Sequence, residues 1–493
     1  MTRSTSRVIA LVLLLATSAA QAADITWGGT YRVEGVKLQN PELRDENSDK
    51  SYLLHHLVLH PKIVAADGIT IFGRLDVLNN PTFGVAPNGQ VISVAGDILG
   101  NGPGDTRLNS SNPRAPTGGS DSNAFGSTQR ASLLSVTTLY LSWAQEFGQL
   151  IIGRAPLHFG LGTAFNAGEG LFDHYITTRD MVSYKVVIGN LFIMPIKAKF
   201  SEGAFNTHAD VDDYIVHVQY DNPETELSLG FLYNTRVVTG NDLPVEDGDS
   251  HLHDYIGGPN AKRGGSYSNN LMGFYLSQKA TDWLRASVEM DILTGDTGVQ
   301  TQAGNGVGFN AWGVAAEFEW LPPEDSKWDA KLKLGVVTGD DPGTLDTWEG
   351  YAFHRNYHVG MLMFNHPLGR VDLFRTGLVR DTKADASTQI DTEAVSNALY
   401  LAPTLGYRAK ENLSYGLTFV YGRLNKDPLE PGFNTALDLG FELDLSLTYK
   451  PMERVTWITE AGALLPGDAW KGGTHNYDTK MVYGIITKAA ISF

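Results

Sequence analysis

The sequence predicts an all-β protein: a transmembrane, antiparallel, up-and-down β-barrel of about 18 strands. Three observations predict this fold. Apolar and polar residues alternate strictly along many segments, short turns alternate with long connections, and no apolar run after the first 22 residues is long enough for a helix to cross a membrane. A chain without such helices crosses a membrane with strands.

The first 22 residues have the pattern of a secretory signal peptide. Arg3 and Arg7 precede a short apolar run over 8–16, and small residues lead to Ala22. That run is well short of the roughly 20 residues that a spanning helix needs. We therefore expect residues 1–22 to be removed and residues 23–493 to form the barrel. The first strand is expected from about Ile25, which argues against a plug domain in the lumen.

Charge and cysteine content exclude several classes of function. The chain has 38 basic and 55 acidic residues, and removal of the signal peptide with its two arginines takes the formal net charge from −17 to −19. Nucleic acid is therefore excluded as a partner. The chain has no cysteine, which excludes disulfides, thiolate metal sites and a cysteine nucleophile. No linker or repeat divides the 493 residues, as expected for one large barrel.

The clearest alternation runs over residues 437–449. Its odd positions hold leucine, phenylalanine or tyrosine, and its even positions hold aspartate, glutamate, glycine, serine or threonine. Similar patterns occur over 25–34, 284–292 and 314–320. A repeat of two requires a sheet with two chemically different faces. Charges on one face and apolar groups on the other predict a lipid-facing outside and a wet lumen.

The connections between these segments alternate in length. Long polar connections cover 79–132, 236–269 and 339–395. Short periplasmic turns and long extracellular loops are typical of outer-membrane barrels, with both termini in the periplasm. The predicted tight turns are Asp67-Gly68, Phe147-Gly148, Gly189-Asn190, Thr281-Asp282, 410–412 and 452–454.

Two features complicate the strand count. Residues 355–379 could form a strand pair, which would raise the count to about 20. That pair would turn Arg375 toward lipid, so we expect an extracellular loop there. Pro61, Pro195 and Pro403 fall inside expected strands and weaken those predictions, because proline has no N–H to donate.

The chain ends in an alternating segment closed by Phe493. A terminal aromatic residue of this kind resembles the signal read by the machinery that inserts outer-membrane barrels. Its ring also suits the aromatic girdle at the membrane interface. We therefore expect Phe493 to serve assembly, with the barrel-assembly machinery, outer-membrane lipid and lipopolysaccharide as partners. The expected location is the outer membrane.

Several short segments resemble the alginate-export type of outer-membrane channel and its porin relatives. They are Glu146–Gly148 with Ile152–Arg154, then Thr338–Asp341, then Glu442–Leu445 followed by Pro466–Asp468. Together they span most of the mature chain. The resemblance implies an 18-stranded monomeric barrel of a Gram-negative bacterium, with loops that narrow a polar lumen. An alginate exporter would be expected to line its pore mainly with cations, whereas the predicted lumen here is mixed.

The predicted lumen face carries both charges. In a closed barrel the early strands lie across from the middle ones, so a basic wall would face an acidic wall. We hypothesise a transverse field that orients polar or zwitterionic solutes. The alternative is local pairing that only keeps the lumen wet. The basic candidates are Arg32, Lys62, Arg74, Arg154, Lys185, Lys197, Lys199 and Arg285; the acidic ones are Glu289, Asp291, Glu317, Glu319, Asp438, Glu442 and Asp444, with Lys331 and Lys333 as counterweights.

Other candidate sites are weaker. The connection 79–132 either constricts the pore or forms a flexible surface. His56 and His60 share a strand face but lie roughly 13 Å apart, too far for one metal ion, so these histidines and His55 are expected at the lumen or rim. The acidic and histidine-containing segment 246–254 matches no calcium loop. Asp340 and Asp341 suit a turn.

The predicted function is that of a porin. No G-x-S-x-G motif occurs, and no catalytic residue, metal or cofactor is predicted. We expect small polar or charged solutes to pass by passive diffusion through a mixed-charge lumen, in a barrel favoured to be monomeric. The alternatives are an exporter of an anionic exopolysaccharide and a surface adhesin or receptor that the barrel anchors. Conductance separates a channel from an anchor.

Overall fold

The computed structural model describes most of the chain. The described residues are 24–41, 43, 49–77, 134–201, 210–239, 262–263, 266–300, 305–341, 343–344, 346–366, 368–369, 394–427, 436–473 and 476–493. The predicted signal peptide and the connection 79–132 lie outside them, as do most of the connection 236–269 and the acidic segment within it.

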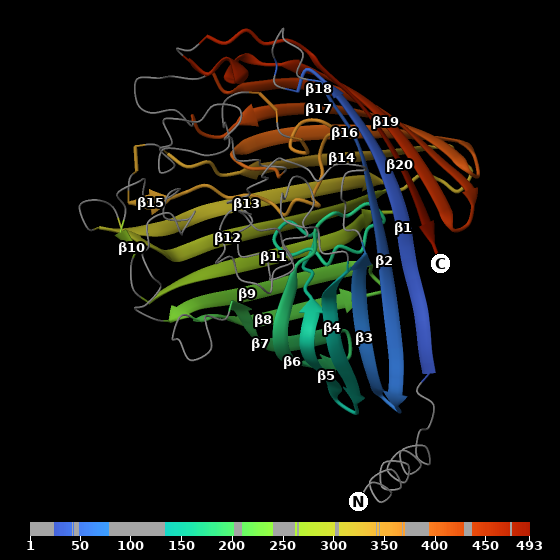
Figure 1. Ribbon diagram of the computed structural model, residues 1–493, viewed down its shortest axis with the longest axis vertical. Helices are drawn as coiled ribbons and strands as arrows, with labels where there is room; N and C mark the ends of the chain where they lie inside the picture. Colours follow the sequence, from blue (N-terminus) through green and yellow to red (C-terminus); the bar gives the residue numbers. More distant parts are fainter. Residues whose placement is uncertain are drawn as a thin grey trace, which may run out of the picture.

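The described residues form one closed antiparallel barrel of 18 long strands, which confirms the predicted fold (Figure 1). Each strand pairs with its neighbour along the chain, and the last strand pairs with the first. The long strands are β1 (Asp24–Gln39), β2 (Lys50–Ala66), β3 (Ile69–Val77), β4 (Leu134–Gln145), β5 (Gly148–Pro156), β6 (Thr178–Ile188), β7 (Leu191–Ser201), β8 (Asp210–Asn222), β9 (Leu227–Thr239), β11 (Tyr267–Thr281), β12 (Leu284–Gln300), β13 (Gly306–Trp320), β14 (Trp328–Val337), β16 (Ala398–Lys410), β17 (Leu413–Leu424), β18 (Asp438–Met452), β19 (Val455–Pro466) and β20 (Val482–Ser492).

Three short elements accompany the barrel. β10 (Lys262–Arg263) pairs with β12, and β15 (Thr347–Trp348) runs parallel to β13. A single 3-10 turn, η1 (Asp468–Lys471), follows β19. In the described part of the chain, no helix is long and apolar enough to cross a membrane.

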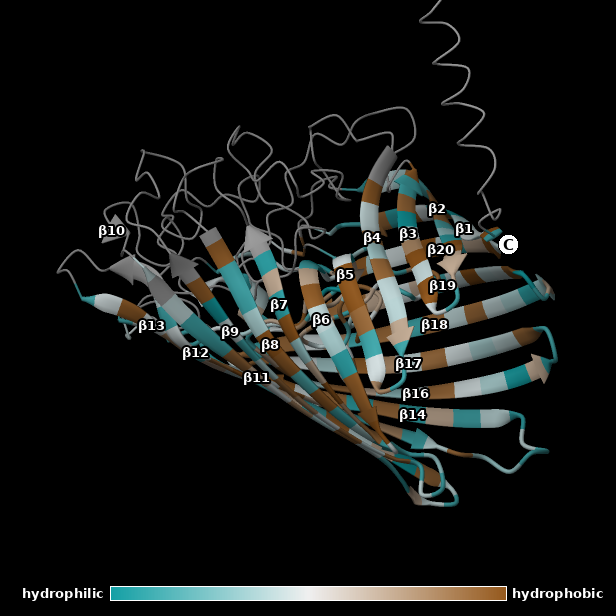
Figure 2. Ribbon diagram, turned by 90° about the horizontal axis from the view of Figure 1, so that it is seen from below, coloured by the Kyte–Doolittle hydropathy of each residue, from teal (hydrophilic) through white to brown (hydrophobic). Residues whose placement is uncertain are grey.

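Alternation along each strand separates the two faces of the barrel wall. On β18, Leu443 and Leu445 are 48% and 57% exposed on the outside. Glu442, which directly precedes Leu443, is 1% exposed on the inside. Figure 2 shows brown and teal bands succeeding one another along many of the strands. A wall with this pattern presents an apolar surface outward and carries most of its polar groups inward.

The predicted short turns lie where expected to within one residue: the turns predicted at 147–148 and 281–282 fall at 146–147 and 282–283. Residues 67–68 and 189–190 make the tight turns between β2 and β3 and between β6 and β7. Gly68 adopts a φ of 75°, and a Cβ there would come within 3.0 Å of the carbonyl oxygen of Ala144. Glycine adopts such a φ without steric cost. The four-residue turn 223–226, between β8 and β9, was not among the predicted turns.

The three prolines lie inside strands at places where pairing is interrupted on one side only. Pro61 pairs with Trp27 of β1, while the β2–β3 register has no partner for it. Pro195 pairs with β8 but not with β6, and Pro403 pairs with β14 but not with β17. A residue without an N–H fits where the ladder needs no donor from it.

Among the described residues, two connections fold into the barrel interior. The first inner loop (residues 157–177) joins β5 to β6, and the second inner loop (residues 349–369) lies in the connection from β14 to β16. The described part of 355–379 holds no strand, in agreement with the predicted loop. Side chains of both inner loops join those of the inner wall in one apolar cluster, which includes Phe159, Phe165 and Leu362.

Candidate functional site: a lumen constricted by two inner loops

The first inner loop is held by two carboxylates of β12. Glu289 accepts hydrogen bonds from the backbone N–H groups of Leu161, Thr163 and Ala164, the last two at 3.4 Å. Asp291 accepts one from the Thr163 hydroxyl at 2.7 Å. Both carboxylates are fully buried. Because residues two apart on a strand point to the same face, one short acidic stretch fixes the loop against the wall.

Glycines on the wall make room for this loop. Phe159 is fully buried, and its ring lies against Gly230 of β9 and Gly273 of β11. A Cβ at Gly273 would come within 2.7 Å of the ring of Phe159. A larger residue there would displace the ring, so the glycine is required for close packing.

The second inner loop is held in the same way by β18. Glu442 accepts hydrogen bonds from the N–H groups of Leu362 at 2.6 Å and Met363 at 2.7 Å. Asp444 accepts one from the N–H of Met361 at 3.0 Å. The buried N–H groups of this loop thus have acceptors on the barrel wall, as buried backbone donors require.

Glycines again receive the side chains of this loop. A Cβ at Gly422 would come within 2.5 Å of the sulfur of Met363, and one at Gly484 within 2.7 Å of the terminal methyl of Met361. Each inner loop is therefore fixed by a carboxylate pair and by apolar side chains seated on glycines.

Asn356 joins the two inner loops across the lumen. Its amide nitrogen donates to the carbonyl oxygen of Tyr175 at 2.7 Å and to the side-chain oxygen of Asn166 at 3.3 Å. Its own side-chain oxygen accepts from the N–H of Tyr175 at 3.2 Å. The N–H of His354 donates to the carbonyl oxygen of Thr163 at 2.6 Å. The loops thus form one connected bridge that narrows the interior.

The surroundings of the second inner loop shift the pKa values of its ionisable side chains. Burial, reinforced by the charge of Lys488, lowers the pKa of His358 to about 3 and that of His366 to about 3. Burial also raises the pKa of Tyr357, which lies beneath the ammonium of Lys333 at 4.8 Å. All three side chains are therefore neutral at pH 7.

A cavity of about 230 Å³ lies beside this bridge. Within it, Lys488 pairs with Glu460 at 2.7 Å, and His174 lies 3.1 Å from Glu34. The guanidinium of Arg355 lies 4.7 Å from the centre of the Tyr175 ring. The cavity is lined by, among others, Tyr175, Arg355, His358, Asp444, Glu460 and Lys488.

A larger cavity, of about 510 Å³, lies between the first inner loop and β1 to β4. Arg32 donates to the carbonyl oxygen of Asp173 at 2.5 Å, and Arg74 to that of Gly168 at 2.9 Å. Lys62 lies 5.8 Å from the ring centre of Phe72 and is the exposed cation of this cavity.

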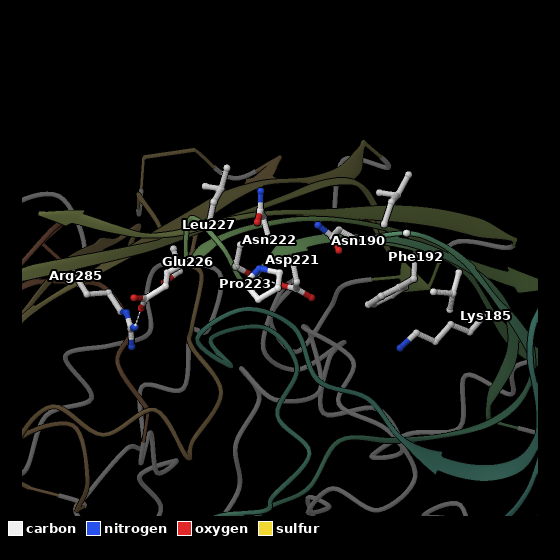
Figure 3. Close-up of a pocket in the computed structure, with 14 residues that line it drawn as sticks. Lys185, Asn190, Phe192, Asp221, Asn222, Pro223, Glu226, Leu227 and Arg285 are labelled. Carbon is white, nitrogen blue, oxygen red and sulfur yellow. Dashed lines mark hydrogen bonds and ion pairs between the residues drawn. The ribbon is translucent and has the colours of Figure 1, made fainter. Parts of the chain in front are cut away.

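A third cavity, of about 630 Å³, opens at the short-turn end of β6 to β12. Figure 3 shows Lys185, Phe192, Glu226 and Arg285 on one side of the sheet and Leu227 on the other. The ammonium of Lys185 lies 3.9 Å from the ring centre of Phe192, and Arg285 forms an ion pair with Glu226. The polar groups here face the barrel interior.

The structure places most of the predicted lumen residues on the inner face, where their charges pair locally. Glu317 lies 2.6 Å from Lys331 and 3.3 Å from Lys333, and Glu319 lies 3.2 Å from Lys331. The inner-face residues are Arg32, Lys62, Arg74, Lys185, Arg285, Glu289, Asp291, Glu317, Glu319, Glu442 and Asp444.

Three basic residues predicted in the lumen lie on the outer face instead. Lys197 pairs with Val182 and Tyr214, which are 53% and 45% exposed on the outside. Arg154 and Lys199 both pair with Asp180 on that same face. The buried residues of β7 are the apolar Ile196 and Ala198, at 4% and 2% exposure. The first inner loop gives the barrel an apolar interior here, so the charged positions turn outward.

Asp438 is the fourth correction. It pairs with Arg423 on the outer face, whereas Leu439 is fully buried inside. The register of β17 and β18 shifts at this point, next to Gly440 with a φ of 98°. Such a bulge exchanges the faces of the residues that precede it.

Two further residues singled out from the sequence, His56 and Phe493, have partners in the structure. His56 is buried and lies 2.7 Å from Asp76. Among the described residues, no group of three histidine, aspartate or glutamate side chains could hold a metal ion. Phe493 exchanges two backbone hydrogen bonds with Gly29 of β1, at 2.9 and 3.0 Å, and thereby extends the seam that closes the barrel.

The first inner loop was missed by sequence reasoning. The segment that forms it contains glycines with positive φ at 160, 162 and 168, which mark a non-strand path. That density of glycine directly after β5 was the available signal. Its direction into the lumen depends on Glu289, 128 residues away from Leu161.

Comparison with solved structures shows the fold again. OccK9 (OpdG) of Pseudomonas aeruginosa is 11% identical and has a TM-score of 0.50, with 95% of this chain and 99% of that chain covered. A BenF-like porin from Pseudomonas fluorescens Pf-5 is 9% identical over the same shares, with a TM-score of 0.49. No known sequence family and no curated protein matches the chain. The match to OccK9 agrees with the closed 18-stranded barrel fold of the chain.

Proposed function

We propose that this chain is an outer-membrane channel through which small polar or charged solutes diffuse. The observation that carries the proposal is the bridge formed by the two inner loops inside a closed barrel. An apolar outer surface suits a lipid environment, and a polar interior suits water. The bridge then sets the width of the passage, as loops folded into such barrels do.

The charged side chains near the bridge favour the passage of polar solutes over that of apolar ones. The cavity beside it is lined by Arg355, Glu460 and Lys488, and the cavity beneath the first inner loop is lined by the exposed Lys62. Charged groups in a narrow passage select solutes by sign and by hydrogen-bonding capacity. Local ion pairs keep both signs present, which is the mixed-charge lumen that we propose.

The size of the spaces favours small solutes over a polymer. The cavities beside the bridge are about 230 and 510 Å³, and the bridge between them is held by hydrogen bonds of Asn356 and His354. A polysaccharide would need a continuous groove past this bridge. Export of an anionic polysaccharide therefore ranks second as a proposal, and a barrel that only anchors surface loops ranks third.

Planar-bilayer recording tests the proposal. We expect the purified barrel to give discrete ohmic steps, and the Asn356→Ala variant to give larger or noisier steps because the bridge loses its three side-chain hydrogen bonds. Asn365→Ala serves as a matched control, since among the described residues the side chain of Asn365 bonds only within its own loop, to Met361. A silent wild-type barrel would contradict a channel, and block by long anionic oligosaccharides would favour the exporter.

A further inference from the structure

A row of charged side chains crosses the outer face of four neighbouring strands. Arg154 of β5 pairs in register with Asp180 of β6, which pairs with Lys199 of β7, which pairs with Asp212 of β8. Directly paired residues on a sheet point to the same side. We name these four residues the outer charged row.

The outer charged row interrupts a surface that is otherwise apolar in this region. Toward the short turns, the outward residues of β5 to β9 include Ile152, Val182, Ile193, Val216 and Phe231, each more than one third exposed. A charge that faces hydrocarbon costs roughly 2–4 kcal/mol at the middle of a bilayer and about 0–1 kcal/mol near its surface. The row must therefore lie at the surface.

The position of the row along the strands agrees with this. Asp180 and Asp212 are the third residues of β6 and β8, and Arg154 and Lys199 are the third from last of β5 and β7. All four lie close to the ends opposite the short turns. In a barrel with periplasmic short turns, that end meets the outer leaflet.

The charges do not cancel. Arg154 bonds to both oxygens of Asp180 at 2.7 Å, and Lys199 lies 3.4 Å from Asp212. Lys197 lies two residues from Lys199 on the same face. Within the described residues it forms no ion pair, and its ammonium lies 5.6 Å from the ring centre of Tyr214. Among the described side chains of this surface, three cations stand against two carboxylates, which leaves a net charge of +1.

We propose that this surface binds the phosphate of an anionic glycolipid headgroup in the outer leaflet. Lys197 and Lys199 supply the cations, while the side chain of Tyr214 packs at the interface, as aromatic residues do there. Asp180 and Asp212 hold Arg154 and Lys199 in place, so the site is ordered before the lipid arrives. The inference rests on the outer-membrane location of the proposed function.

Titration of the detergent-solubilised full-length barrel with diphosphoryl lipid A tests this site. At about 1 kcal/mol for each lysine near a charged surface, Lys197→Ala should weaken binding roughly 5-fold and Lys197→Ala with Lys199→Ala roughly 30-fold. Lys37→Ala is the matched control, because Lys37 lies on the outer face of β1 between Ser51 and Ile485, without a second cation paired to it in register. It should bind like the wild type.

Two results would overturn the proposal. Equal lipid A affinity in the wild type and both lysine variants would show that Lys197 and Lys199 do not bind this lipid. Inorganic phosphate that binds as tightly as lipid A, with the same dependence on Lys197, would assign the site to a free ion instead of a lipid. Bilayer conductance is recorded in parallel so that the two proposals can fail separately. A wild-type barrel that conducts but does not bind lipid A would contradict the lipid site and leave the channel standing. A silent wild-type barrel that binds lipid A would contradict the channel and leave the lipid site standing.

Discussion

At the scale of single residues, what a side chain can do is decided by the face of the wall on which it lies. Lys62 and Lys197 are both lysines on strands next to aromatic rings, Phe72 and Tyr214. The first lies in the interior and the second on the outside. Their charges therefore act on different surroundings, the interior cavities and the apolar outer surface.

This difference gives the first prediction, which also bears on the predicted transverse field. Lys62→Glu reverses a charge in the cavity beneath the first inner loop, so the permeability ratio of cations to anions should rise by several fold. Lys197→Glu is the control and should leave that ratio unchanged. The measurement is the reversal potential under a salt gradient. Equal reversal potentials in Lys62→Glu and the wild type would count against selection by lumen charge.

At the scale of elements, each inner loop depends on a carboxylate pair far away in the sequence. Glu442→Gln keeps the shape of the side chain but replaces one of the two oxygens that accept the N–H groups of Leu362 and Met363 with an amide NH2 group, which cannot accept a hydrogen bond. A buried N–H group left without an acceptor costs about 1–3 kcal/mol. We expect protease to cleave the second inner loop at least tenfold faster in this variant.

The control for that measurement is Glu289→Gln. It should expose the first inner loop in the same assay and leave cleavage of the second inner loop much less affected, since the hydrogen bonds of Glu289 to described residues all go to the first inner loop. Identical cleavage patterns in the two variants would contradict separate anchoring of the loops.

The second inner loop should also respond to acid. His358 and His366 have pKa values of about 3 in the folded loop, against an ordinary value of 6.5. A base with a lowered pKa contributes stability above its unfolded pKa and loses it as the pH falls through 6.5, by about 1.4 kcal/mol for each unit and histidine. Current noise should therefore increase between pH 7 and pH 5. His358→Gln with His366→Gln should flatten this dependence, and an unchanged pH profile would contradict it.

Sequence alone predicted the strands well, because alternation over 437–449 and 284–292 needs only a wall with two faces. It did not predict which face is inside where the interior is also apolar. Around Ile196 and Ala198 the first inner loop fills the lumen with Phe159 and Phe165, and the charges of Lys197 and Lys199 turn outward. Asp438 was misplaced because a bulge at Gly440 is not visible in the alternation.

At the scale of the whole molecule, closure depends on the seam between β1 and β20. Ten residue pairs run along it, from Thr30 with Ser492 to Gln39 with Tyr483. Phe493 adds two backbone hydrogen bonds to Gly29, and a Cβ at Gly29 would come within 2.7 Å of its ring. The terminal residue therefore has a structural role besides its expected part in assembly.

The two roles of Phe493 can be separated. Gly29→Val should force the ring away and lower the temperature at which the barrel unfolds in detergent, while Phe493→Ala should lower it less, because the backbone hydrogen bonds stay. If the aromatic ring serves assembly, Phe493→Ala should instead reduce the amount of folded barrel in the outer membrane. Heat-modifiable migration on gels measures both. A normal yield for Phe493→Ala would contradict the assembly role.

The seating of the inner loops imposes an order on biogenesis. The loop that follows β5 cannot be seated before β12 has joined the wall, and the loop that precedes β16 cannot be seated before β18 has. Until nearly every strand is in place, the nascent cylinder lacks its internal narrowing. In the proposed channel, a stalled insertion intermediate would consequently be a wider and less discriminating pore than the finished protein.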